Sequence, residues 1–418
     1  MEWKEVRLGE VCEIKHGFAY KGKYFSDTPT CDILVTPGNF TLSGGFKLDK
    51  PKFYNGPVEK DYILSKGDLI VTMTDLSKNI DTLGYSALVP EVKGFTFHHN
   101  QRIGLVENIA NNVDKYFLYW IMRTPAYQSF IATHSSGTTV HHTSPKGIGN
   151  YVFKLPPLDD QRRIASILSS LDRKIELNNK INADLEEMAQ AIFKNWFVDF
   201  EPFKNGKFVD SELGMIPEGW KVGSPYEYVK VVYGAPYKSA KFNDNGEGLP
   251  LIRIRDLKDC NPQFYTPEIL PQTEYVNKGD IIAGMDAEFV PHIWKGNTGL
   301  LNQRVCKLMP QRTSISNLFV LHLMKPELEF VQSYKTGTTV SHLGKADIDK
   351  FVVVLPPLEV VEDCSIILDS ILQRIKNISA QSRTLSLLRD TLLPRLMSGE
   401  IEVPEQSGAE RMPPLTNK

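Results

Sequence analysis

Two pairs of adjacent histidines are the residues in this sequence whose types and spacing come closest to a metal or acid–base site. They are His98-His99 and His141-His142. Neighbouring side chains on a strand point to opposite faces, and no cluster of Cys or Asp beside either pair completes a metal site. The cysteines are scattered and form no C-x-x-C pair. We therefore expect no metal site and no disulfide framework, as in a reducing, cytoplasmic setting.

Motifs that hold nucleotides or a methyl donor are also missing from the sequence. It has no G-x-x-x-x-G-K-[ST] loop and no strand-linked G-x-G-x-x-G. Asn261-Pro-Gln-Phe264 faintly resembles the N-P-P-F/Y motif of amino-methyltransferases, but it lacks the second proline, and we interpret it as a turn. No nucleophile–base pair is evident. The sequence therefore predicts no catalytic residues.

The composition is that of an ordinary globular protein. Hydrophobic residues make up 41% and charged residues 23% of 418 residues, and the formal net charge is −2. Proteins that coat nucleic acid indiscriminately are usually strongly basic. Nucleic-acid binding would therefore depend on local patches or on a partner. No run of 18 apolar residues suggests a membrane span.

The elements that would position binding residues occur twice in the sequence. The repeated segments keep their order, while their offset falls from 217 residues near the start to 200 near the end. They are Gly17–Phe25 with Gly234–Phe242, Lys66-Gly-Asp68 with Lys278-Gly-Asp280, Asn100-Gln-Arg102 with Asn302-Gln-Arg304, Gly137-Thr-Thr-Val140 with Gly337-Thr-Thr-Val340, and Leu155-Pro-Pro-Leu158 with Leu355-Pro-Pro-Leu358. An ordered set with loop-sized deletions indicates an internal duplication.

The sequence of each copy predicts a mixed α/β domain. Short runs rich in Val, Ile, Tyr and Phe between Gly, Pro, Asn and Asp predict strands. Examples are 32–36 and 68–72 in the first copy, with 251–254 and 280–283 in the second. A short helix is predicted around 115–122, with its counterpart around 318–324. Paired prolines cannot continue a strand ladder, so Leu-Pro-Pro-Leu is expected to end each domain.

About 40 residues almost free of Gly and Pro follow each Leu-Pro-Pro-Leu segment. Seven-residue spacing connects Ile164, Leu171, Asn178, Leu185 and Ile192, and also Leu168, Ile175, Asn182, Ala189 and Trp196; the second copy keeps it in Cys364, Ile371, Ile378, Leu385 and Leu392. This pattern predicts long helices in a coiled-coil pair. A helix of ~40 residues spans roughly 60 Å, more than one domain's width, which argues against a helix lying on its own domain.

Connectivity predicts that the two helices run antiparallel, with a domain at each end and a pseudo-twofold axis between them. Asn178 and Asn182 fall on the seam, opposite apolar or small residues by register, where they would fix the alignment or contact a partner. The expected boundaries are 1–154 for the first domain, 155–200 for the first helix, 201–354 for the second domain, 355–400 for the second helix and 401–418 for a tail.

This ordered, duplicated set closely resembles the specificity (S) subunits of type I restriction–modification enzymes. The resemblance is carried by L-P-P-L-x-x-Q-x-x-I at Leu155–Ile164, by the preceding shared segments, and by the helix end Asn195-Trp-Phe-Val-Asp-Phe200. It covers nearly the whole chain up to about Val403. The second copy departs from the pattern with Val361 in place of the glutamine and with Pro394 in its helix.

The resemblance implies that each domain is a target recognition domain for one half of a split, asymmetric DNA site. It implies that the helices set the gap and dock two modification subunits, which use S-adenosylmethionine to methylate adenine. Two restriction subunits would add ATP- and Mg²⁺-dependent translocation and cleavage. The S subunit itself would catalyse nothing and bind no cofactor directly. It also suggests that Gln161, Arg162, Arg163, Asn178 and Asn182 contact partner subunits.

Two alternatives remain open. The chain could be a duplicated protein-binding scaffold that does not bind DNA, which its nearly neutral charge mildly favours. It could also serve a related enzyme in which methylation and cleavage share one polypeptide.

Residues shared by the two copies should build the fold or hold phosphates, because phosphates carry no sequence information directly. Thr138 and Thr139, with Thr338 and Thr339, fit either a phosphate-binding turn or a purely structural one. For Arg102 and Arg304, a salt bridge inside the fold is the preferred interpretation over a phosphate contact.

Polar residues that differ between equivalent loops are the candidate base readers, since Arg and Lys suit guanine edges and Asn suits adenine. In the first copy we select Lys21, Lys23, Thr74, Lys78, Asn79, His98, His99, His141 and His142. In the second we select Lys238, Lys241, Arg253, Arg255, His292, Lys295, Ser341 and His342.

Overall fold

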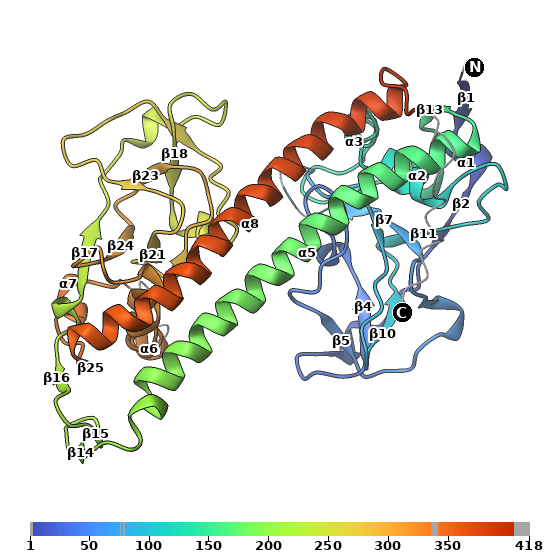
Figure 1. Ribbon diagram of the computed structural model, residues 1–418. Coiled ribbons are helices and arrows are strands. Elements are labelled where there is room, and N and C mark those ends of the chain that lie inside the picture. Colours follow the sequence, from blue (N-terminus) through green and yellow to red (C-terminus); the bar gives the residue numbers. More distant parts are fainter. Residues whose placement is uncertain (1–2, 76, 78–79, 336–341, 405–418) are drawn as a thin grey trace. The chain divides into compact units, whose positions relative to one another are not determined.

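A computed structural model describes residues 3–75, 77, 80–335 and 342–404, which form two compact units (Figure 1). Unit 1 runs to Arg173 and resumes at Leu385, whereas unit 2 is Lys174–Thr384. Each unit therefore holds one globular domain together with a piece of each long helix. The predicted tail, 401–418, lies almost wholly outside the described residues.

The domain of unit 1 is built on two sheets. The first has the strand order β2-β11-β7-β9 and is antiparallel throughout: Glu13–His16, Ile103–Glu107, Leu69–Thr72 and Ser86–Leu88. The second has the order β3-β5-β4-β10-β6: Phe25–Ser26, Lys52–Tyr54, Asp32–Val35, Thr96–His99 and Ile63–Leu64. Its β4 and β10 are parallel.

Shorter elements complete this domain. Two ladders join β1 to β13 and β8 to β12: Lys4–Arg7 with Val152–Leu155, and Thr74–Asp75 with His141–His142. The helices are α1 (Leu8–Val11), α2 (Lys115–Ile121), α3 (Pro125–Thr133) and α4 (Pro145–Gly149).

Unit 2 repeats this topology, as the duplication in the sequence predicts. One sheet has the order β17-β24-β21-β22: Val229–Tyr233, Val305–Pro310, Ile281–Gly284 and His292–Ile293. The other has the order β19-β18-β23-β20, with β18 and β23 parallel: Tyr265–Thr266, Leu249–Ile252, Gly299–Leu301 and Tyr275–Val276.

The remaining elements of unit 2 enclose these sheets. Two ladders join β16 to β25 and β14 to β15: Lys221–Gly223 with Val353–Leu355, and Phe208–Val209 with Ile216–Pro217. The helices are α6 (Asn317–Lys335) and α7 (Lys345–Ile348). The predicted strands are thus confirmed in both copies as β4, β7, β18 and β21, and the predicted helices as α2 and α6, although α6 continues well beyond the predicted 318–324 to Lys335.

The long helices begin where the paired prolines predict. They are α5, Leu158–Phe197, and α8, Leu358–Ser398, and each starts directly after its Pro-Pro pair. Pro394 lies inside α8, which continues to Ser398 before Gly399 adopts φ +77°. That left-handed conformation is typical of a glycine that ends a helix. No helix of the described ranges is long and apolar enough to span a membrane.

The two helices pack antiparallel within each unit. In unit 1 the start of α5 and the end of α8 share a core through Ile164, Leu168, Leu393 and Leu396. In unit 2 the end of α5 packs with the start of α8, through residues such as Leu185, Ala189, Leu368 and Ile375. The predicted seam is confirmed, and it also faces the domains, since both clusters continue into their sheets.

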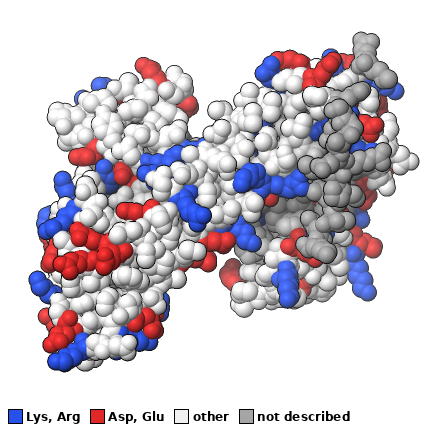
Figure 2. All heavy atoms as spheres, viewed as in Figure 1, with Lys and Arg blue, Asp and Glu red and all other residues white. Residues whose placement is uncertain are grey.

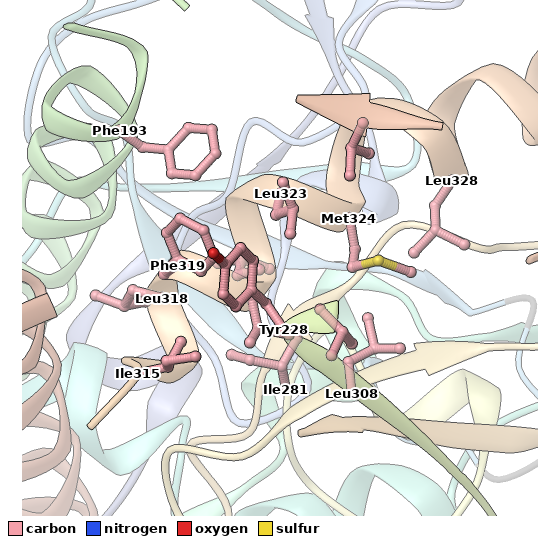
Figure 3. Close-up of a cluster of buried hydrophobic side chains, with 14 of the residues drawn as sticks. Phe193, Tyr228, Ile281, Leu308, Ile315, Leu318, Phe319, Leu323, Met324 and Leu328 are labelled. Carbon is pink, nitrogen blue, oxygen red and sulfur yellow. The ribbon is translucent and has the colours of Figure 1, made fainter. Parts of the chain in front are cut away.

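The core of unit 2 illustrates this continuity (Figure 3). Phe193 of α5 lies 5.6 Å from Phe319 of α6, measured between ring centroids, and Phe319 meets Tyr228 edge to face at 5.9 Å. Ile281 and Leu308 of the sheet complete the same buried cluster. The domain of unit 2 is thereby attached to α5 by a continuous apolar core.

Candidate nucleic-acid interface

The shared Asn-Gln-Arg segment forms a tight crossing in both units. Asn100 bridges in parallel to Phe18, and its side chain Oδ1 accepts the Arg102 N–H at 3.1 Å. A Cβ on Gly17 would lie 2.1 Å from the Asn100 carbonyl oxygen, which leaves room only for glycine. The backbone approach thus explains why Gly17 and Asn100 recur.

The second unit repeats the crossing with the equivalent residues. Asn302 bridges in parallel to Ala235 and accepts the Arg304 N–H at 3.3 Å. A Cβ on Gly234 would lie 2.1 Å from the Asn302 carbonyl oxygen. In both units the crossing therefore places one arginine, Arg102 or Arg304, on the surface in the same backbone setting.

A second shared contact brings the chain after the Gly-Thr-Thr-Val segment to this arginine. In unit 1, Met73 N–H donates to the Arg102 carbonyl, and Thr143 N–H donates to the Met73 carbonyl. In unit 2, Met285 donates to Arg304 and Leu343 to Met285 in the same way. The next residues form an antiparallel backbone bridge, Thr74 with His142 in unit 1 and Asp286 with His342 in unit 2.

These contacts make His142 and His342 equivalent positions. The sequence predicts both as base readers in differing loops, yet both occupy the same bridge at the same 200-residue offset. Residues that both copies share cannot encode the difference between two half-sites. His142 and His342 therefore belong with the common framework of the two domains. The difference lies in their partners: Thr74 Oγ1 lies 3.1 Å from Nδ1 of His142, whereas Asp286 Oδ1 lies 2.7 Å from Nδ1 of His342.

The preferred interpretation of Arg304 as part of an internal salt bridge is confirmed. Its Nη1 lies 2.8 Å from Oδ2 of Asp286, so this carboxylate holds both Arg304 and His342. For Arg102 the same prediction is not supported, because among the described residues no acidic side chain pairs with its exposed guanidinium. The two equivalent arginines therefore have different electrostatic surroundings.

The Gly-Thr-Thr-Val turn is described in unit 1 only. Gly137 has φ +98°, and a Cβ there would meet the Val140 carbonyl oxygen at 2.0 Å, so the position requires glycine. Thr138 and Thr139 are exposed beside it, and His141 is partly exposed in β12. The turn leaves both hydroxyls accessible. The selected residues Lys78, Asn79, Thr338, Thr339 and Ser341 lie outside the described residues.

The lysines near the start of each copy occupy equivalent 3-10 turns. Lys21 and Lys23 are exposed, and the Lys23 Nζ lies 4.8 Å from the centre of the Tyr24 ring. In unit 2, Lys241 pairs with the buried Glu268 at 3.0 Å, and the Lys238 N–H donates to the same carboxylate at 2.9 Å. Positive charge is again balanced by a carboxylate in unit 2.

Of the other candidate base readers in unit 2, some pair with acidic side chains and one is exposed. Arg253 donates from Nε to Asp256 at 3.2 Å and stacks 4.2 Å from the centre of the Phe264 ring. Arg255, two residues on, is exposed. Lys295 pairs with Glu186 of α5 at 2.5 Å. Arg253 and Lys295 thus contribute to the fold, and Arg255 is the more accessible candidate.

His292 is partly buried, like Arg253. Its Nε2 lies 3.5 Å from a Glu288 oxygen, and burial is the main cause that lowers its pKa. A neutral, half-buried ring of this kind is a weak candidate for a phosphate or base contact.

Three residues selected as base readers in unit 1 are buried, and that prediction is wrong for them. His98 and His99 have no exposed surface in β10, which lies between β4 and β6, and Thr74 is 4% exposed. His98 Nε2 lies 2.6 Å from Asp32, and His99 Nε2 donates to the Ile103 carbonyl at 2.7 Å. Side chains that pack against β10 bury both histidines, with the ring of Tyr20 6.0 Å from that of His98 and the ring of Tyr62 6.1 Å from that of His99, whereas the prediction assumed an exposed loop.

Gln161 and the seam asparagines are also internal, which contradicts their selection as partner contacts. Gln161 is fully buried, and Asn178 and Asn182 are 1% and 6% exposed. Asn178 donates to Gln381 at 2.9 Å, and Asn182 donates to Ser379 Oγ at 3.1 Å. The prediction that they fix the helix alignment fits these pairs. Ser379 is one of the expected small residues, whereas Gln381 is neither apolar nor small.

The neighbouring Arg162 is exposed, and Arg163 is partly buried. Arg162 lies 3.6 Å from Asp159 and is largely exposed, while Arg163 pairs with Asp160. These two are the selected partner-contact residues that the structure leaves at the surface.

The sequence does not predict a partly buried ion cluster that the structure shows in unit 1. Asp172 of α5 binds Arg123, just after α2, at 2.7 Å and Arg389 of α8 at 2.6 Å. Arg123 also donates from Nε to the Ser43 carbonyl at 2.8 Å. The seven-residue spacing gave no signal for it, because Asp172 lies beside the apolar positions and both arginines come from other elements.

Charged side chains of both signs are interspersed on the face shown in Figure 2, in line with the net charge of −2. Among the described residues, no group of three or more His, Cys, Asp or Glu side chains is arranged to hold a metal ion. The sequence-independent attraction for DNA would therefore depend on a few local basic groups.

The model of a family described as type I restriction modification DNA specificity domain matches residues 1–187 and 217–385. The two matched ranges correspond to the two copies.

Individual relatives carry the same description. The MjaIX specificity subunit of a type I restriction enzyme from Methanocaldococcus jannaschii is 27% identical over 316 residues, which cover 69% of this chain and 69% of the relative. The HindI specificity subunit from Haemophilus influenzae is 24% identical over 481 residues, covering 96% and 100%. The crystal structure of a type I S subunit from M. genitalium superposes with a TM-score of 0.53 at 13% identity, covering 97% of each chain, which shows a shared fold.

Proposed function

Since this chain belongs to the family of type I restriction–modification specificity subunits, we propose that its two domains each read one half of a bipartite, asymmetric DNA sequence. The chain would select the site, and other subunits would carry out the chemistry. The helices would set the gap between the half-sites and dock two methyltransferase subunits.

The observation that carries this proposal is the repeated crossing with divergent loops around it. Both units present an arginine and a histidine through the same backbone contacts, at Arg102 with His142 and at Arg304 with His342. A DNA backbone looks alike in both half-sites, whereas the bases differ. A common framework surrounded by different side chains suits two half-sites of different sequence.

Exposed apolar side chains on the long helices support subunit docking. Leu177 and Met188 of α5 are each 52% exposed, and Ile366 and Leu387 of α8 are 73% and 70% exposed. Large apolar groups on an otherwise polar helix face are typical of a protein contact. S-adenosylmethionine, ATP and Mg²⁺ would be bound by the methyltransferase and by two restriction subunits, and none by this chain.

A gel-shift experiment separates this function from the alternative of a scaffold that does not bind DNA. The chain, assembled with its modification partner, is mixed with labelled DNA carrying the motif that methylome sequencing of the host assigns to it. We expect sequence-dependent binding that weakens with salt. Binding of the partner without any DNA binding would instead support the scaffold. If the partner carried both the methylation and the cleavage activity in one polypeptide, the chain would instead be the specificity subunit of that related, combined enzyme.

Arg255 offers a residue-level test of base reading. Its exposed side chain follows β18, on a turn that has no counterpart of the same sequence in unit 1. We expect Arg255→Ala to relax specificity in one half-site only, at a cost of about 1–3 kcal/mol in discrimination. Arg253→Ala is the neighbouring control, since it removes the Asp256 and Phe264 contacts and should loosen the turn itself. Equal weakening on all sequences by Arg255→Ala would mark a phosphate contact instead.

A further inference from the structure

The two equivalent arginines differ in whether a carboxylate already occupies their guanidinium. Arg304 is held by Asp286 at 2.8 Å, and the same carboxylate accepts from His342 at 2.7 Å. At the equivalent place in unit 1 stands Thr74, whose hydroxyl meets His142 at 3.1 Å. Unit 1 therefore has the arginine and the histidine without the carboxylate.

The equivalence of these positions rests on backbone contacts and not on the sequence alignment alone. The bridge Thr74–His142 corresponds to Asp286–His342, and both residues 73 and 285 donate to the arginine carbonyl. The side chains compared thus start from the same backbone geometry. The difference is one negative charge, which Asp286 places between Arg304 and His342 in unit 2 and which Thr74 does not supply in unit 1.

A carboxylate bound to an arginine satisfies the same donors that a phosphate would use. A guanidinium that already carries such a pair has less to gain from a phosphate, because the existing bond must first be lost. An exposed guanidinium without an acidic partner gains the whole interaction and releases a counterion from the DNA. Arg102 is of the second kind and Arg304 of the first.

A second contrast points in the same direction. Lys21 and Lys23 of unit 1 are exposed, and no ion pair to them is found among the described residues. In unit 2 the equivalent turn surrounds the buried carboxylate of Glu268, which pairs with Lys241 Nζ at 3.0 Å and accepts from the backbone N–H of Lys238 at 2.9 Å. At two independent sites, therefore, a carboxylate pairs with a basic side chain in unit 2. The corresponding basic side chains of unit 1 have no such pair among the described residues.

We propose that Arg102 and His142 hold a DNA phosphate in the first domain, and that Asp286 occupies the corresponding place in the second. This inference rests on the proposed function and adds an asymmetry to it. The sequence-independent, salt-sensitive part of binding comes mainly from the first domain. The second domain depends more on base and shape contacts, and Asp286 determines this division.

The test measures how the DNA affinity of the assembled complex varies with salt. Fluorescence anisotropy with a labelled duplex that spans both half-sites gives the slope of log K against log salt concentration. Each phosphate contact contributes about 0.9 to this slope on duplex DNA. We expect Arg102→Gln to reduce the slope by about 0.9, while Arg304→Gln, at the equivalent position, leaves it nearly unchanged.

Exchanging the residues between units provides the reciprocal test. Asp286→Thr gives unit 2 the residue of unit 1, and it should steepen the slope by about 0.9 because Arg304 becomes available. Asp286→Asn, which keeps the shape without the charge, should act in the same direction. Thr74→Asp should reproduce the effect of Arg102→Gln while Arg102 is still present.

The outcomes distinguish this inference from the function on which it rests. Equal losses from Arg102→Gln and Arg304→Gln, or no change of slope with Asp286→Asn, would overturn the asymmetry while DNA recognition stood. A wild-type complex without salt-sensitive DNA binding would contradict the proposed function itself. Because Thr74 is buried, Arg102→Gln decides the case if Thr74→Asp fails to fold.

Discussion

At the scale of single residues, Gln161 connects the start of α5 to the start of α2. Its Oε1 accepts from the Asp114 N–H at 2.8 Å, and its Nε2 donates to the carbonyls of Asn112 and Pro156 at 3.0 and 2.8 Å. The second copy has Val361 at this position, and there Ser365 Oγ accepts from the Ser316 N–H at 2.9 Å. A different side chain, one helical turn later, thus makes the equivalent contact.

We expect Gln161→Ala to lower the free energy of unfolding by about 1–3 kcal/mol, because it leaves buried polar groups without partners. Urea denaturation of the full chain measures the loss, and amide exchange at Asp114 localises it. The matched control is Arg162→Ala one residue away, which is exposed and should change stability by less than about 0.5 kcal/mol. Unchanged stability combined with a loss of partner assembly would restore Gln161 as a partner contact.

His99 gives unit 1 a pH dependence. Burial lowers its pKa to about 4, and the positive charges of Lys15 and His16 act in the same direction, while the bond to the Ile103 carbonyl opposes them. The unfolded chain binds this proton near pH 6.5. Stability is therefore fully present above about pH 6.5 and is lost as the pH falls towards 4, by up to about 3 kcal/mol.

The measurement is the unfolding midpoint of wild type and His99→Gln between pH 4 and 7. We expect a flatter profile for His99→Gln, since glutamine can donate to the Ile103 carbonyl but does not titrate. His322 of unit 2, whose pKa burial also lowers to about 4, should keep its own share of the acid sensitivity in this variant. Superimposable profiles would mean that His99 does not cause the loss.

At the scale of elements, the cluster of Arg123, Asp172 and Arg389 ties α2, α5 and α8 together in unit 1. The residue equivalent to Asp172 in unit 2 is Leu372, which is buried and apolar. We expect Asp172→Asn to destabilise unit 1 by about 3 kcal/mol, because it leaves the buried Arg123 guanidinium without a carboxylate, whereas Arg389 keeps its pair with Asp390.

Chemical denaturation of the full chain tests this expectation, with Asp159→Asn as the control. Asp159 lies on the same helix, with its side chain 84% exposed, and surface pairs of this kind contribute little. If both substitutions proved equally mild, solvent would be screening the cluster and the helices would be held by apolar packing alone.

The elements show where sequence reasoning succeeds and where it stops. Pro-Pro pairs and seven-residue spacing predicted both long helices to within three residues at each end, because these signals are local. The partners of Asn178 and Asn182 could not be predicted reliably, because alignment by register does not say which side chain rotates into the seam. The buried positions of His98 and His99 depend on the side chains that pack against β10, such as Tyr20 and Tyr62, which only the folded domain reveals.

At the scale of the whole molecule, the duplication separates what is common from what is specific. Both units keep the same pair of sheets, the same glycine at the crossing and the same seam with the helices. They differ in the outer strands and in the carboxylates that surround the shared basic groups. The order of repeated motifs predicted the common part, but the carboxylates come from loops with no match between the copies.

This separation predicts that the domains can be exchanged independently. Each domain packs on its own pieces of the helices, through Ile164 and Leu168 in unit 1, so a new domain 1–154 that preserves these contacts should fold. We expect such a chimera, with the domain of another family member, to change one half of the methylated motif and to leave the other half and the gap unchanged. Methylome sequencing of a host that expresses the chimera measures both halves of the methylated motif and the gap in one experiment.

The reciprocal exchange of 201–354 is the matched control and should alter only the other half. A change in both halves from either exchange would mean that reading is shared between the domains, and the proposal of one domain for one half-site would fail.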